Sequence, residues 1–101
     1  MDATEQKIVA EIEQLQRAAG EKWTRSCAAE KAFEDIAVAT QSTPPQSVIN
    51  AKHAAVFEYN LAVWNVEHAK WRRYRWLVSR GRANGAYVAH PGARPYLTAA
   101  R

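Results

Sequence analysis

The positions of proline and glycine divide the chain into two long stretches that can each form an uninterrupted helix. Residues 2–39 contain no proline and a single glycine, and residues 46–80 contain neither. The segment TQSTPPQS separates the two stretches, and Gly81 follows the second. Because proline interrupts helices and glycine commonly ends them, the sequence predicts helices over about 2–39 and about 44–80.

Residues at the ends of these stretches carry capping signals. Asp2 precedes Glu5 by three positions, a spacing typical of a capping pair at the start of a helix. Thr43, Pro44 and Gln46 predict the second start, with Thr43 as N-cap and Pro44 as the first helical residue. We therefore expect both helices to begin at defined residues.

The short connection between the two helices forces them to run antiparallel, with opposed residues whose numbers add up to about 84. This register places the N-terminal acidic residues beside the basic run 70–82. It also brings Glu30, the carboxylate inside the apolar stripe of the first helix, level with His53, which predicts a buried polar pair. The expected fold is an all-α helical hairpin (1–80) with an extended basic C-terminal arm (81–101), in an oligomer.

Composition and charge are consistent with one small helical domain. The 101 residues are 48% hydrophobic and carry a net charge of +4, divided into −3 over residues 1–43 and +7 over residues 44–101. Such a division predicts two halves that neutralise each other or meet different partners. The single cysteine, Cys27, excludes an intramolecular disulfide and is expected to be a small buried apolar residue.

The second helix carries more apolar surface than one neighbouring helix can cover. One arc, expected to face the first helix, holds Val48, Ile49, Val56, Tyr59, Val63, Val66, Tyr74 and Leu77. A second arc is surplus, and we expect it to be buried by the arm, by other copies of the chain or by another protein. The predicted protein interface combines this second arc with apolar residues of the arm: Phe57, Leu61, Trp64, His68, Trp71, Tyr87, Tyr96 and Leu97.

Six cations cluster at the end of the second helix, without an acidic residue among them. They are candidate contacts for phosphate groups or for an acidic partner: Lys70, Arg72, Arg73, Arg75, Arg80 and Arg82. Tryptophan and tyrosine side chains are interleaved with them and are suited to stacking on bases, but the sequence contains no helix-turn-helix, RRM or zinc-finger pattern. Nucleic acid is therefore a partner that we consider but do not favour.

The sequence contains none of the motifs that carry common chemistry. His53, His68 and His90 share no metal-ligand spacing with one another or with Cys27, and no phosphate-binding glycine loop or nucleophile motif occurs. We expect no enzymatic activity, no metal and no cofactor. We also expect neither a secretory signal nor a membrane span, and therefore a location in the cytoplasm or within an assembled particle.

These features together predict a non-enzymatic structural or adaptor protein that docks into a larger protein assembly, for example a phage or virus particle. The apolar face of the second helix and the basic arm would make the contacts. Two alternatives remain open at this point: a small helical inhibitor that binds a host protein complex, and a basic accessory protein that binds nucleic acid.

Overall fold

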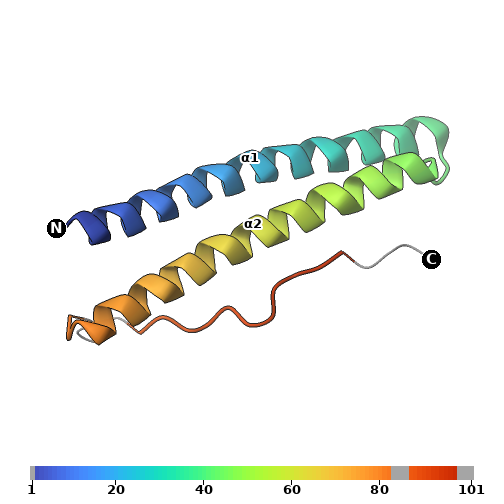
Figure 1. Cartoon of the computed structure of the whole chain (residues 1–101). Coiled ribbons are helices and arrows are strands. Elements are labelled where there is room, and N and C mark those ends of the chain that lie inside the picture. The colour runs from blue at the N-terminus through green and yellow to red at the C-terminus, as the bar shows by residue number, and fades with distance from the viewer. Residues whose placement is uncertain (1, 83–86, 98–101) are drawn as a thin grey trace.

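The computed structural model describes residues 2–82 and 87–97 and contains two long antiparallel helices (Figure 1). Helix α1 spans Ala3–Thr40 and helix α2 spans Gln46–Ser79. The described residues form no strand. The prediction of an all-helical hairpin is therefore confirmed, with helix boundaries that differ from the expected ones by one or two residues.

The start of α1 follows the predicted capping pattern, whereas the start of α2 does not. The backbone N–H of Glu5 donates a hydrogen bond to Asp2 Oδ1 at 2.8 Å. At α2, however, the N-cap is Pro45 and not Thr43, and no side chain caps the helix. The reason is steric: a residue that precedes proline is disfavoured in the α conformation, so Pro44 cannot open the helix.

Gly81 ends α2 as expected. Its φ of 66° lies in the left-handed region, where glycine carries no steric penalty. The backbone N–H of Gly81 donates to the Val78 carbonyl at 2.9 Å, and that of Arg82 donates to the Leu77 carbonyl at 2.9 Å. These two bonds are those of a Schellman motif, and they satisfy carbonyl groups that the last helical turn would leave unpaired.

Small side chains form the closest contact between the helices. The buried apolar residues are Ala62, Val66 and Ala69, which follow one another along α2 at spacings of four and three. Of the eight residues predicted to face α1, only Val66 is buried, and the others are half-buried. Ala62 and Ala69 lie on the helix beside Val66 but outside the predicted arc, because alanine gives a weak apolar signal in sequence.

The hairpin is elongated and exposes much surface for its size. Its radius of gyration is 18.4 Å, whereas a compact chain of this length has about 13 Å. The accessible surface is 7325 Å², against about 5,800 Å² for a monomeric protein of 11.4 kDa. An antiparallel pair of helices therefore covers only a narrow stripe of each.

Residues 87–97 have neither helical nor strand structure and lie along α2 (Figure 1). They run beside α2 on the side away from α1, so that α2 lies between α1 and this segment. We refer to residues 87–97 as the C-terminal segment. Its course decides which part of the apolar surface of α2 remains uncovered.

Candidate protein-interaction surfaces

Three aromatic side chains of the second arc of α2 stack on one another and on the C-terminal segment. The ring of His68 lies parallel to that of Trp64, with 4.6 Å between the centroids, and 5.7 Å from that of Trp71. His90 meets Trp71 edge-on at 4.7 Å. The indole nitrogen of Trp64 donates a hydrogen bond to the Gly92 carbonyl at 3.1 Å. The C-terminal segment of the same chain thus covers part of this arc.

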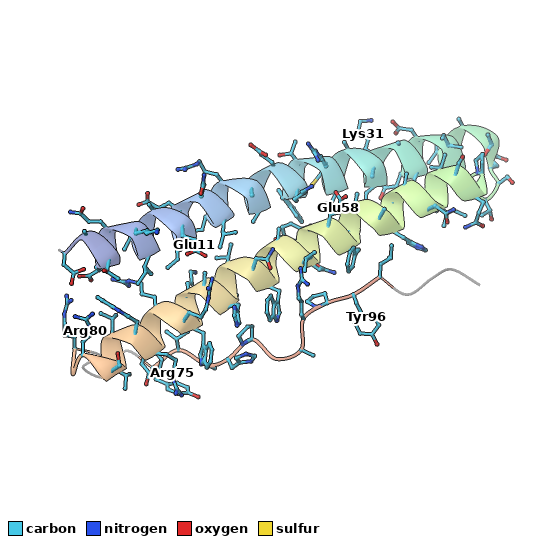
Figure 2. The ribbon with its side chains drawn as sticks, in the orientation of Figure 1. Glu11, Lys31, Glu58, Arg75, Arg80 and Tyr96 are labelled. Atoms are coloured by element: carbon cyan, nitrogen blue, oxygen red, sulfur yellow. The ribbon has the colours of Figure 1, made fainter. Side chains whose placement is uncertain are left out.

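The residues predicted to form a protein interface fall into two groups. Those on α2 are half-buried: Phe57, Leu61, Trp64, His68 and Trp71. Those on the C-terminal segment are exposed, with 76% of Tyr87, 77% of Tyr96 and 59% of Leu97 accessible. Figure 2 shows the side chain of Tyr96 pointing away from α2. The uncovered apolar surface is therefore greater on the C-terminal segment than on the α2 row itself.

The surroundings of His68 disfavour its protonation. Desolvation among the aromatic rings is the largest cause that lowers its pKa below the ordinary value of 6.5, and electrostatic interactions with Arg72 and His90 add to it. His90 in turn accepts a hydrogen bond at Nδ1 from the backbone N–H of Gly92, at 3.0 Å. The contact between α2 and the C-terminal segment thus contains two imidazoles in one cluster.

Carboxylates of α1 form ion pairs with part of the basic run, as the predicted register indicates. Glu5, only 4% exposed, lies 3.6 Å from Arg73 and 3.0 Å from Arg82. Glu11 pairs with Arg72 at 2.9 Å, and this pair is half-exposed. Three of the six predicted cations thus pair with carboxylates of α1. The sequence did not single out Glu5 as the carboxylate that pairs with two arginines, although the predicted register places it beside the basic run.

The remaining cations of the run lie on α2 and just beyond its end. Arg75 and Arg80 each lie over a tryptophan ring of α2, with 5.6 Å and 4.8 Å between the guanidinium carbon and the ring centroid. Lys70 is 3.6 Å from Glu67 on the preceding turn. Figure 2 shows Arg80 at the end of the hairpin where the N-terminus also lies.

The expected buried pair between Glu30 and His53 is not buried. Both side chains are exposed, although they line the same depression between α1 and α2 beside Pro95 and Tyr96. The prediction is wrong because two helices do not enclose the edge of their contact. A carboxylate at that edge keeps its water and needs no buried partner.

Cys27 and Trp23 of α1 are also exposed, because two helices do not enclose the edge of their contact. Cys27 was predicted to be buried and is exposed. Trp23 is 55% exposed and packs one side of its ring against Tyr59, with 5.1 Å between the centroids. Trp23 thus lies at the open edge of the contact between α1 and α2.

The described residues contain no group of three or more histidine, cysteine, aspartate or glutamate side chains placed to hold a metal ion. Neither α1 nor α2 is long and apolar enough in sequence to cross a membrane, and no other helix lies within residues 2–82 and 87–97. Compared with protein-family models, with curated proteins and with solved structures, the chain finds no match.

Proposed function

We propose that this protein is a non-enzymatic structural or adaptor component that docks into a larger protein assembly. The observation that carries the proposal is the surface that the hairpin leaves uncovered. The accessible area of 7325 Å² exceeds that of a compact monomer of this mass by about 1,500 Å². A stable protein interface of ordinary size covers about 800 Å² on each partner, so the excess is sufficient for one or two contacts.

The surface best suited to docking lies where the C-terminal segment passes the first half of α2. Tyr96 and Leu97 are exposed there, and Tyr96 lines a depression together with Val56 and Phe57 of α2. Exposed aromatic and aliphatic side chains gain free energy when another protein covers them. A small component of a phage or virus particle is one kind of protein that would use such a surface.

Nucleic-acid binding has less support as the main function. Glu5 and Glu11 already occupy the guanidinium groups of Arg72, Arg73 and Arg82. A phosphate backbone would have to compete with these carboxylates, and each cation withdrawn from the run lowers the electrostatic part of the affinity. We therefore assign the basic run first to holding the ends of the hairpin together.

The test is co-purification of the full-length protein from the cells that make it, with a matched pair of variants. Tyr96→Ala combined with Leu97→Ala removes the exposed side chains of the docking surface. Val38→Ala removes an apolar side chain that is equally exposed, at 77%, but lies on α1. We expect the same companion proteins, in fixed ratio, with the wild type and with Val38→Ala.

The double variant should recover at least about tenfold less of these companions, because two large apolar contacts are lost. Circular dichroism and thermal unfolding should show an unchanged fold, since both side chains are exposed in the isolated chain. Equal recovery with all three proteins, or no companion with the wild type, would argue against the proposal.

A further inference from the structure

A groove lies between α1 and the C-terminal segment, and α2 forms its floor. At one end it is lined by Val9 and Gln16 of α1, Tyr74 and Leu77 of α2, and Val88 of the C-terminal segment. Its lining at this end is mainly apolar, and it is open to solvent.

The same face continues to the other end of the molecule. Glu30 lies two heptads beyond Gln16 on α1, and Val56 lies two heptads before Lys70 on α2, so each pair shares one side of its helix. Glu30 and Val56 line the second depression together with Pro95. The two depressions therefore lie on the same face of the hairpin, one toward each end, and we refer to them together as the groove.

The opposite face of the hairpin is closed by ion pairs. Lys22 and Glu58 lie 3.2 Å apart there, and Glu11 and Arg72 lie 2.9 Å apart. Figure 2 shows Glu11 and Glu58 along the junction between the two helices. These two ion pairs between α1 and α2 lie away from the groove, whereas Arg73, which pairs with Glu5, lines it. Lys70, at the edge of the groove, pairs with Glu67 of its own helix.

Charges of opposite sign lie along the two helical edges of the groove. The α1 edge carries the carboxylates Glu13 and Glu30, and the α2 edge carries Lys70 near one end and Lys52 and His53 near the other. Glu13 is level with Lys70, and Glu30 is level with Lys52. A helix that enters the groove over α2 should therefore be acidic on the side that it presents, as α1 itself is.

We propose that the groove receives α1 of a second copy of this chain, and that the two copies form a symmetric dimer. The two-fold axis runs along the length of the hairpin, so that each α1 lies over the α2 of the other copy. Glu13 then meets the partner subunit's Lys70, and Glu30 meets the partner subunit's Lys52. The face-to-face alternative, with the axis across the hairpin, would set carboxylate against carboxylate and cation against cation, which is repulsive.

Packing and area favour the same arrangement. Every helix in this dimer has antiparallel neighbours, so the helix dipoles oppose one another, as in four-helix bundles. The half-exposed ring of Trp23 lies about midway between Glu13 and Glu30 and would fall at the centre of the interface, where aromatic residues contribute most. The uncovered excess of about 1,500 Å² is larger than one subunit needs to contribute.

The dimer goes beyond the proposed docking function, since it names a defined companion, a second copy of the chain. It shares with the docking surface the depression lined by Val56 and Tyr96. The test is the molar mass of the full-length protein by light scattering over a range of concentrations. We expect the wild type to reach twice the 11.4 kDa of one chain. Lys70→Glu and Glu13→Lys should each weaken the dimer by about tenfold or more, because each change creates two repulsive contacts by symmetry.

An equimolar mixture of Lys70→Glu and Glu13→Lys should regain the dimer, because Glu and Lys again face each other in both contacts. The double variant Glu13→Lys with Lys70→Glu should also regain it. Lys31→Glu is the control, because Lys31 points away from α2 (Figure 2) and should leave the molar mass unchanged. Repulsion within one chain would persist in the mixture, so recovery on mixing identifies a contact between copies.

Three results would overturn the inference. One is a wild type that stays at 11.4 kDa at every concentration. Another is a mixture that remains monomeric although both single variants dissociate. The third is a dimer that neither single variant weakens, which would place self-association on another face. None of them bears on co-purification through Tyr96 and Leu97, so the dimer and the docking function can fail separately.

Discussion

The indole nitrogen of Trp64 donates a hydrogen bond to the carbonyl oxygen of Gly92, 28 residues further along the chain, at 3.1 Å. This bond joins the centre of α2 to the C-terminal segment. The stacked rings of His68, Trp71 and His90 continue the contact along the helix. The aromatic row of α2, which could have been an open docking face, is thus partly covered within the chain itself.

Replacing Trp64 by Phe should loosen the C-terminal segment without unfolding the hairpin. The ring remains, but the hydrogen bond to Gly92 is lost, at a cost of about 0.5–1.5 kcal/mol. Hydrogen exchange measured by mass spectrometry should show faster exchange in peptides that cover residues 87–92. The same substitution at Trp76, which lines the opposite face beside Ile8, should leave these peptides unchanged. Identical exchange in both variants would contradict the role of the bond.

Replacing Glu5 by Gln should destabilise the hairpin more than replacing Glu11 by Gln. Glu5 is buried and serves two arginines, Arg73 and Arg82, so loss of its charge should cost about 1–3 kcal/mol. Glu11 forms a half-exposed pair, and its loss should cost less than about 1 kcal/mol. The free energies of unfolding from urea titrations measure the difference. Equal values for the two variants would show that burial of Glu5 adds nothing.

Replacing Ala69 by Leu should overpack the seam between the helices. Ala69 is 3% exposed and lies beside Ile8 and Ile12, so three extra carbon atoms would push α1 away. We expect a loss of about 1–3 kcal/mol in the free energy of unfolding. Ala51→Leu, at an exposed position of α2, provides the control and should change it little. A seam that accepted leucine at 69 without loss would not be closely packed.

Acidification should weaken the contact between α2 and the C-terminal segment. The pKa of His68 lies below 6.5 in the folded protein because of burial, Arg72 and His90, so the unfolded chain binds more protons at mildly acidic pH. The stabilisation is complete above pH 6.5 and declines as the pH falls toward the lowered pKa. Thermal unfolding between about pH 7.5 and about pH 5 measures it.

His68→Phe preserves the stacked ring and removes this titration. His90 and His53 remain in the variant, so the difference between the two pH profiles isolates the effect of His68. We expect a flatter profile for His68→Phe than for the wild type. Parallel profiles would mean that protonation of His68 does not affect the folded state.

The sequence was sufficient for the helices and their register, because breakers and charges determine both. The double proline and Gly81 limit the helices, and the acids of α1 meet the cations of α2 at the expected level. The start of α2 is also contained in the sequence, because Pro45 disfavours the helical conformation at Pro44 and so excludes Pro44 as the first helical residue. Helix breakers and charge positions can be recognised in the sequence without knowledge of how the helices pack.

The faces of the helices were harder to assign, because burial depends on the third dimension. Cys27 and Glu30 lie on the apolar side in sequence, yet a single neighbouring helix leaves that edge open to water. The closest contact lies at Ala62 and Ala69, whose small side chains give a weak signal in sequence. The contact between Trp64 and Gly92 joins a helix to an irregular segment and has no periodic signature.

The most direct test is the size at which this protein sediments in a fresh lysate of the cells that make it. We propose that other protein chains cover the exposed apolar surface of the hairpin when the protein functions. We therefore predict that the protein sediments with a mass well above the 11.4 kDa of a single chain. Sedimentation as a free chain of 11.4 kDa, at natural abundance, would contradict it.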